Sequence, residues 1–186
     1  MSRRLFIGVE PPEDIKSALL RLEYGLPDIR WVPPESFHIT LRFLGNVDEA
    51  SLPELDYHLG SISFAAMHYS INGIGYFKKG KYCTHLWAGI APDEDFMEFA
   101  RSVNAYFEPG ITAQKFARNY KPHITLARPK KREMKDVTSF LEHNALFKIR
   151  DIPLTEFHVY ESFLHEDGPE YQIIGTYQAQ DAGLHD

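Results

Sequence analysis

Phe37-His38-Ile39-Thr40-Leu41 returns 85 positions later as Pro122-His123-Ile124-Thr125-Leu126. Successive side chains of a β-strand point to opposite faces, so each copy places an imidazole and a hydroxyl on one face and apolar residues on the other. A single His-x-Thr is too loose a pattern to carry an argument. Two copies in matching apolar frames predict two related strands whose polar faces form a site.

The length and composition are those of an ordinary globular chain. It has 186 residues, 44% hydrophobic and 25% charged, enough for one domain with its own core. The lone cysteine, Cys83, cannot form an internal disulfide and suggests a reducing compartment. No apolar stretch approaches the ~20 residues of a transmembrane helix, so we expect a cytosolic protein without membrane association.

The charge is unevenly distributed. The net charge is -6, yet the segment 115–135 has one acidic residue, Glu133, and eight basic ones: Lys115, Arg118, Lys121, Arg128, Lys130, Lys131, Arg132 and Lys135. A local basic patch beside a site suits a phosphate-bearing ligand, whereas an acidic remainder limits unspecific binding to polyanions. The plain alternative, a solvated charged loop, applies above all to residues 130–135.

Hydrophobic periodicity predicts strands mixed with helices. The expected strands are 3–9, 38–44, 68–77, 82–90, the second motif strand, 152–164 and 170–178. The expected helices are 11–25, 48–59, 93–107 and 134–143. This order is typical of an α+β protein. The doubled motif further predicts a bilobal domain over residues 1–178, with two pseudo-symmetric antiparallel sheets, helices outside and a central groove lined by the motif strands; residues 179–186 would be a polar tail.

The paired motifs indicate acid–base chemistry. Histidine titrates near neutral pH, so two imidazoles across a groove can act as one acid and one base, while two threonine hydroxyls donate to phosphoryl oxygens. No nucleophile constellation is evident, and one good ligand per motif does not make a metal site. We therefore expect neither a metal nor another cofactor, and a substrate that is already activated, such as a strained cyclic phosphate.

Four segments together resemble the 2H phosphoesterase superfamily, and within it the RNA 2',3'-cyclic phosphodiesterases, also called 2'-5' RNA ligase-like proteins. These segments are Leu5 to Val9, Phe37 to Gly45, Lys121 to Arg128, and Val159 to Ser162. The resemblance covers nearly the whole chain. It implies a bilobal fold and an enzyme that hydrolyses a terminal 2',3'-cyclic phosphate of RNA to a 2'-phosphate without a required metal.

The resemblance also implies residue roles. His38 would protonate the leaving 3' oxygen as general acid, and His123 would accept a proton from the attacking water as general base. Thr40 and Thr125 would hold the phosphate, although threonine is also a common strand residue. The order of acid and base stays open because the groove is nearly symmetric.

Two arginines are candidates for substrate binding. Arg42 has the parity of His38 and could reach the groove or face solvent. Arg128 has the opposite parity to His123, so it enters the groove only if a bulge or the strand end re-aims it; the resemblance favours a phosphate role over a structural ion pair. Phe43 has core parity, which counts against base stacking.

Other functions remain open at this stage. The same site could serve a 2'-5' RNA ligase or a 2'-5' phosphodiesterase, because hydrolysis and ligation share one acid and one base. A non-catalytic RNA-end binding module is a further alternative. The expected partners are RNA with 2',3'-cyclic phosphate ends or small cyclic nucleotides, and we expect the protein to be a monomer.

Overall fold

The computed structural model describes residues 1–186 except 27–28, 92, 108–119, 130–131, 166–167 and 181–186. Most of its strands form where apolar residues alternate along the sequence. The strands are β1 (Ser2–Val9), β2 (Ile39–Asp48), β3 (Met67–Lys79), β4 (Tyr82–Ile90), β5 (His123–Ala127), β6 (Arg132–Glu133), β7 (Lys148–Leu154), β8 (Glu156–His165) and β9 (Gly168–Gln178). The α-helices are α1 (Glu13–Leu20), α2 (Leu52–Gly60), α3 (Glu94–Ala105) and α4 (Met134–His143). Short 3-10 helices span Arg21–Gly25, Pro34–Ser36 and Glu49–Ser51.

The strands form one curled antiparallel sheet in the order β7-β3-β4-β5-β2-β1-β8-β9, and β6 pairs with β4. The motif strands β2 and β5 lie at its centre, where a single pair, Ile39 and Ile124, joins them. We call β2, β1, β8 and β9 the first half, and β5, β4, β3, β7 and β6 the second half. The α+β fold with two related halves is confirmed; the two expected sheets are joined at this one pair.

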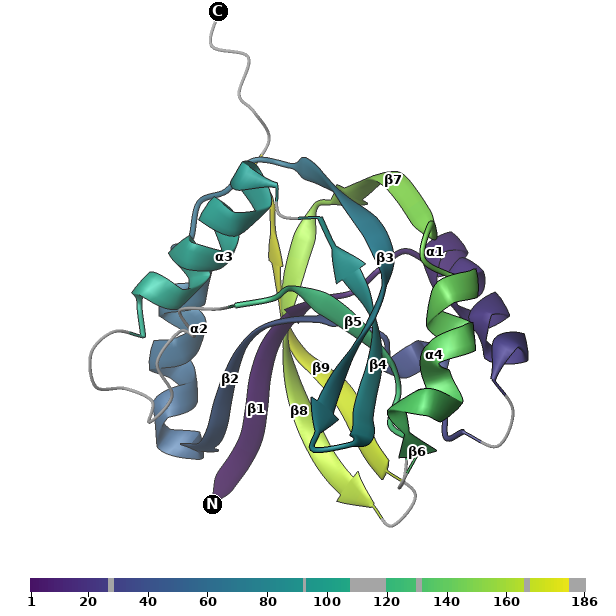
Figure 1. Ribbon diagram of the computed structural model, residues 1–186. Coiled ribbons are helices and arrows are strands. Elements are labelled where there is room, and N and C mark those ends of the chain that lie inside the picture. The colour runs from purple at the N-terminus through teal and green to yellow at the C-terminus, as the bar shows by residue number, and fades with distance from the viewer. Residues whose placement is uncertain (27–28, 92, 108–119, 130–131, 166–167, 181–186) are drawn as a thin grey trace, which may run out of the picture.

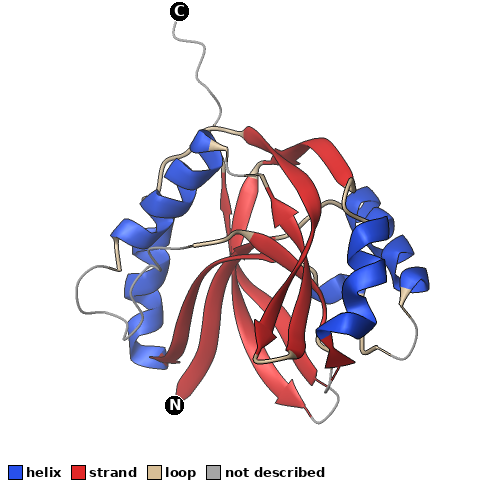
Figure 2. Ribbon diagram, in the orientation of Figure 1, coloured by secondary structure: helices blue, strands red, loops and turns tan. Residues whose placement is uncertain are grey.

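The helices cover two flanks of the sheet, with α2 and α3 on one and α1 and α4 on the other (Figures 1 and 2). Helix α3 follows β4 of the second half, yet it contacts β2 of the first. Helix α1 follows β1 of the first half, yet the carboxylate of Asp14 acts on the pKa of Tyr69 in β3 of the second. The two halves therefore interleave, and the single domain over residues 1–178 stays a prediction.

The motif strands contribute their alternate residues to the core. Ile39 and Ile124 are both fully buried, and burying one such side chain stabilises a fold by about 1.5–3 kcal/mol. Gly8 of β1 lies against Ile39: a Cβ at Gly8 would be 2.9 Å from the carbonyl oxygen of Ile39 and 3.4 Å from the ring of Tyr160. Glycine at this position therefore permits the close approach of β1 to the first motif strand.

One expected strand is wrong. The run 152–164 is two strands separated by Thr155: β7 pairs with β3 in the second half, whereas β8 pairs with β1 in the first. The closing hairpin of β8 and β9 is confirmed. The expected first helix is α-helical only from Glu13 to Leu20 and continues as a 3-10 helix.

The end of the chain is partly described. The amide of Gln180 donates to the carbonyl of Phe64 at 2.9 Å, so the expected tail begins with residues anchored to the fold. Residues 181–186 lie outside the described residues. In the described part of the chain, no helix combines the length and apolar character needed to cross a membrane.

Candidate active site

The register of β2 and β5 brings the two His-x-Thr motifs together. Ile39 lies directly opposite Ile124, and both point into the core. The residues that flank these isoleucines therefore face each other on the opposite side as the pairs His38–Thr125 and Thr40–His123. Opposed residues on one face of an antiparallel pair have Cβ atoms about 4.5–5.5 Å apart. All four side chains line one groove, as the sequence predicts.

A β-bulge follows each motif at the same place. The pairing of β2 with β1 shifts at Leu41, and the pairing of β5 with β4 shifts at Leu126. Each bulge reverses the alternation, so the fifth residue after each histidine returns to the groove side. These residues are Phe43 and Arg128, and both line the groove. The condition that the sequence sets for Arg128, a bulge that turns it toward the groove, is met, whereas the core parity assigned to Phe43 is wrong: its side chain is 52% exposed.

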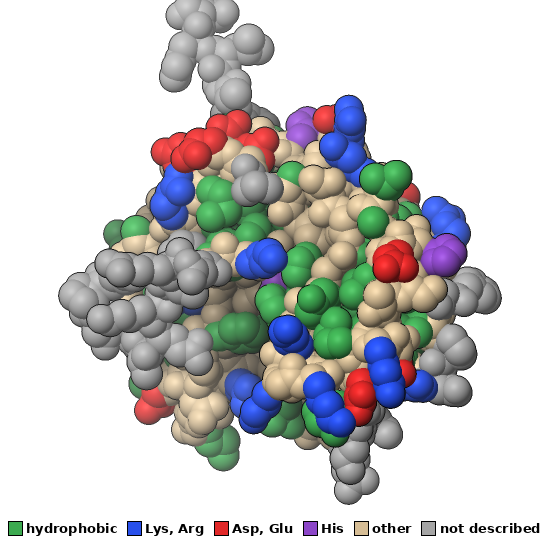
Figure 3. Space-filling view, in the orientation of Figure 1, with side chains coloured by type: hydrophobic (Ala, Val, Ile, Leu, Met, Phe, Trp, Pro, Cys, Tyr) green, Lys and Arg blue, Asp and Glu red, His purple; other side chains and the backbone are tan. Residues whose placement is uncertain are grey.

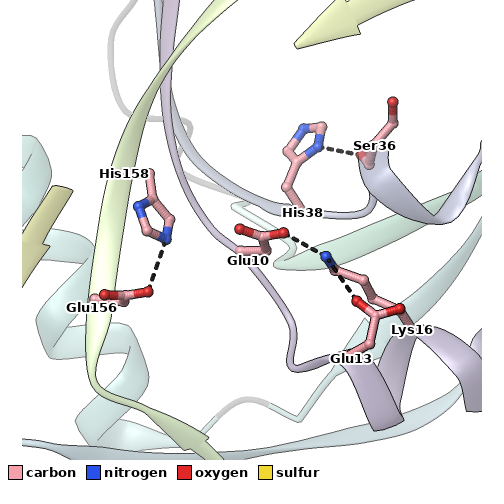
Figure 4. A network of polar contacts seen from close by, with 7 residues as sticks. All are labelled: Glu10, Glu13, Lys16, Ser36, His38, Glu156 and His158. Atoms are coloured by element: carbon pink, nitrogen blue, oxygen red, sulfur yellow. Dashed lines mark hydrogen bonds and ion pairs between the residues drawn. The ribbon is translucent and has the colours of Figure 1, made fainter. Parts of the chain in front are cut away.

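Both imidazoles are held by the same type of hydrogen bond. Nδ1 of His38 lies 2.8 Å from the carbonyl oxygen of Ser36 (Figure 4), and Nδ1 of His123 lies 2.7 Å from that of Lys121. A carbonyl oxygen only accepts, so each Nδ1 must carry and donate a hydrogen. In the neutral ring Nε2 is then the unprotonated nitrogen, ready to exchange a proton with a ligand.

The His38 ring is packed among aromatic side chains. Its centroid lies 4.7 Å from that of Phe6 and 5.0 Å from that of Tyr171, which meets it edge-on. The pKa of His38 is lowered to about 4, chiefly by burial; the hydrogen bond to Ser36 opposes this shift, and the positive charges of Arg128 and His123 add to it. A bound anion beside Arg128 would oppose this shift, because it favours the protonated ring.

The His123 ring has a similar but more open setting. It meets Phe77 edge-on with ring centroids 5.1 Å apart, and Trp87 lies on another side at 5.9 Å. Burial lowers the pKa of His123, and the ammonium of Lys121 lowers it too. Both histidines are therefore mainly neutral at pH 7 in the free protein.

Two cavities meet at the motif residues. The groove, of about 870 Å³, is lined by both histidines and both threonines. A side cavity of about 1120 Å³ opens beside it, next to Trp31, Pro33 and Glu35. The residues that line both are His38, Thr125, Arg128, Pro169 and Tyr171. This junction is where an anion would contact an imidazole, a hydroxyl and a guanidinium together.

Arg42 does not share the side of His38, contrary to the parity prediction. It is among the residues that line the groove, but its side chain is only 5% exposed. Its Nη1 donates to Oδ1 of Asn104 at 3.0 Å, and its guanidinium lies 5.1 Å from the ring centroid of Phe107. The bulge at Leu41 explains this placement, and we do not include Arg42 in the proposed phosphate contacts.

Sequence reasoning missed three groove residues. His85 belongs to no motif in the sequence, but it lines the groove, and burial lowers its pKa. Tyr120 donates from its buried hydroxyl to the carbonyl of Thr40 at 2.8 Å and so links the segment before β5 to β2. Lys121 was noted only as part of the basic segment. The repeat offered a signal for Lys121, because it occupies the position of Ser36.

Other parts of the chain are structural or lie outside the site. His158 is 3% exposed, with Nδ1 3.0 Å from Oγ1 of Thr176 and Nε2 3.5 Å from Oε1 of Glu156 (Figure 4). Figure 4 also shows Lys16 paired with Glu10 and Glu13 at the start of α1.

In the basic segment, Lys115, Arg118, Lys130 and Lys131 lie outside the described residues. Within the described ranges, no cluster of three or more His, Cys, Asp or Glu side chains could hold a metal.

The fold and site define a phosphoesterase of known type. The family described as LigT like Phosphoesterase matches residues 9–85 and 90–171, and each matched segment contains one His-x-Thr motif. The match covers more than half of the chain. The protein therefore belongs to this family.

Several curated relatives carry one name. The RNA 2',3'-cyclic phosphodiesterase of Thermus thermophilus is 30% identical over 182 residues, which cover 92% of this chain and 87% of the relative. The protein of the same name from Methanocaldococcus jannaschii is 29% identical and is covered to 98%. The crystal structure of TT0787 of Thermus thermophilus matches with a TM-score of 0.76 at 25% identity, over 97% of this chain and all of that one. E. coli LigT complexed with 3'-AMP, at 20% identity and a TM-score of 0.72 over 97% and 99% of the chains, shares the fold.

Proposed function

We propose that this protein is a metal-independent RNA 2',3'-cyclic phosphodiesterase that converts a terminal cyclic phosphate into a 2'-phosphate. The observation that carries the proposal is the pairing of Ile39 with Ile124, because it places two imidazoles and two hydroxyls on one face of the sheet. The family and the shared name of the relatives support the same reaction class. The proposal also rests on the tautomer of each ring, which leaves Nε2 for proton transfer.

The chemistry needs one acid and one base on opposite sides of phosphorus. Nε2 of His123 takes a proton from water while the water oxygen forms a bond to phosphorus. The bond from phosphorus to O3' breaks, and protonated Nε2 of His38 gives its proton to O3'. The product is a 2'-phosphate with a free 3' hydroxyl. His38 is then neutral and His123 protonated, so one proton must be exchanged through solvent before the next turnover.

The developing negative charge is met by the remaining motif residues. The hydroxyls of Thr40 and Thr125 donate to the non-bridging oxygens, and the guanidinium of Arg128 supplies positive charge from the junction of the two cavities. This cation performs the charge neutralisation for which many phosphoryl-transfer enzymes use a metal. Strain in the five-membered ring lowers the remaining barrier.

Phe43 and Arg128 occupy equivalent positions in the two halves, and their difference orients the substrate. Arg128 attracts the phosphate, whereas the exposed ring of Phe43 offers a face on which a nucleobase can stack. The ring of Phe43 also lies 5.8 Å from that of Phe6, which packs on His38. A base on Phe43 therefore places its ribose on the His38 side, in agreement with His38 as the acid.

Product analysis tests the proposed function. A short oligoribonucleotide ending in a 2',3'-cyclic phosphate is incubated with the protein in excess chelator, and the ends are separated chromatographically. A 2'-phosphate product is expected. A 3'-phosphate product would refute the assignment of His38 to O3', and binding without turnover would make the protein an RNA-end binding module. Loss of activity in the chelator would refute the metal-free mechanism.

The side cavity favours one alternative reaction. It reaches the phosphate junction from a second direction and has room for a nucleotide-sized group. If a second RNA bound there supplied its 5' hydroxyl in place of the attacking water, the two histidines would make or break a 2'-5' linkage; His38, which lines this cavity, would then act as the base and His123 as the acid. Incubating cyclic-phosphate RNA with a 5'-hydroxyl acceptor would detect this as a longer product. All proposed catalytic groups come from one chain, so the proposal requires only a monomer; a cytosolic location stays a prediction.

A further inference from the structure

The groove is strongly cationic although the chain is acidic overall. The net charge is -6, but the described residues lining the groove include four cations and no Asp or Glu, the cations being Arg4, Arg42, Lys121 and Arg128. The side cavity is mixed, because Glu35 and Glu170 accompany its arginines. Figure 3 shows Lys and Arg side chains beside hydrophobic ones around a hollow between the two halves. The cyclic phosphate carries a single negative charge, so the groove holds more positive charge than that group needs.

Among these groove cations, Lys121 is held in place by a neighbouring aromatic ring. Its Nζ lies 4.7 Å from the ring centroid of Trp87, a cation–π arrangement worth about 0.5–1 kcal/mol at an exposed site. Trp87 pairs with Gly75 on the neighbouring strand. The tryptophan ring lies directly over this glycine and occupies the space that a side chain at position 75 would need. The ammonium is thus held at the wall of the groove next to His123 while its side chain stays exposed.

The internal repeat shows that this lysine is a departure from symmetry. Ser36 and Lys121 are equivalent, since each accepts from the Nδ1 of the histidine two residues later. Ser36 is buried beside the side cavity, whereas Lys121 lines the groove. The exposed ring of Phe77 lies on the same wall of the groove as His123, and the exposed ring of Phe43 lies on the wall of the first half. The groove therefore combines stacking faces with cations, the combination that binds single-stranded nucleic acid.

We infer that Lys121 forms a subsite for the phosphate on the 5' side of the terminal nucleotide, so that the enzyme prefers oligoribonucleotide ends to cyclic mononucleotides. This inference rests on the proposed function. The terminal base stacks on Phe43, the cyclic phosphate lies between the motif residues, and the preceding phosphate meets the ammonium of Lys121. A cyclic mononucleotide lacks that phosphate and leaves the subsite empty.

The experiment compares a cyclic mononucleotide with the dinucleotide that carries one further phosphate on its 5' side. Wild-type kcat/KM is expected to be about tenfold higher for the dinucleotide, the usual value of one charged contact. Lys121→Ala should bring kcat/KM for the two substrates to within about twofold of each other, while Lys121→Arg should keep most of the preference. Each variant is measured at its own pH optimum, because Lys121 also lowers the pKa of His123. Lys135→Ala, on an exposed lysine paired with Glu133, is the matched control and should behave as wild type.

Salt dependence gives a second readout that a structural effect would not produce. In a plot of log kcat/KM against the logarithm of the salt concentration, the slope for the dinucleotide should be more negative than that for the mononucleotide by about 0.7, the value for one extra phosphate contact. Lys121→Ala should abolish this difference in slope. Equal losses on both substrates, or a wild-type enzyme indifferent to length, would overturn the subsite. If neither the mononucleotide nor the dinucleotide were hydrolysed, the proposed function itself would be overturned.

Discussion

The lowered pKa values of the two histidines predict an acidic optimum for kcat/KM. The proposed mechanism requires one proton on the pair of histidines, and this form is most abundant midway between the two pKa values. The pKa of His38 is about 4 and that of His123 lies below its ordinary value of 6.5, so the optimum should lie below about pH 5.3. Above pH 6.5 kcat/KM should fall about tenfold per unit, to about 100-fold at pH 8.5. The profile of kcat should lie at higher pH, because the bound phosphate anion raises both pKa values.

The assay is the initial rate on a cyclic mononucleotide at constant ionic strength between about pH 3 and pH 8.5, a range that includes the acidic limb set by His38. Arg128→Gln tests the cause. The charge of Arg128 lowers the pKa of His38, so its removal raises that pKa and moves the acidic limb to higher pH. Arg101→Gln, on an exposed arginine paired with Glu94, is the control and should leave the profile unchanged. A wild-type limb in kcat/KM that falls with a pKa of 7.5 or above would refute this account of the site.

Three further outcomes are expected. His38→Ala and His123→Ala should each lower the rate about 10²- to 10⁴-fold with an unchanged circular dichroism spectrum; a near wild-type rate in either variant would remove that residue from proton transfer. Gly8→Ala should lower the free energy of unfolding by about 1–3 kcal/mol in urea titrations, because its Cβ would lie 2.9 Å from a backbone oxygen of the first motif strand. Gly60→Ala, which has open space at its Cβ, is the control, and equal stability of the two variants would contradict the reasoning. Asn104→Ala removes hydrogen bonds to one guanidinium and two carbonyls and should cost about 2–3 kcal/mol; a loss below about 0.5 kcal/mol would show that the site relaxes.

The sequence was sufficient to predict the centre of the molecule. Strand alternation around Ile39 and Ile124 correctly separates core from polar positions, and the repeat predicts that the two polar faces meet. The helices were equally readable where an apolar stripe and a first-turn signal coincide, as in α3, whose Asp93 accepts a hydrogen bond from the amide of Asp95. These features depend on neighbours in the sequence, so local rules capture them.

Features that depend on pairing between distant strands were not readable. The bulge at Leu41 reverses the sides of Arg42 and Phe43, yet a bulge is defined by the partner strand and leaves the local pattern unchanged. The sequence gives no break between β7 and β8 because only Thr155 separates them. The role of Lys121 likewise required the position of Trp87 on another strand.

The order of strands in the first half has a consequence for synthesis. Strands β8 and β9 enter that half from the far end of the chain and complete the wall around His38 with Tyr160 and Tyr171. A ribosome must therefore translate past Tyr171 before this pocket can close. Chains that stop before β8 would contain both His-x-Thr motifs and still lack the aromatic wall around His38, so an intact His38 pocket depends on residues far downstream of both motifs.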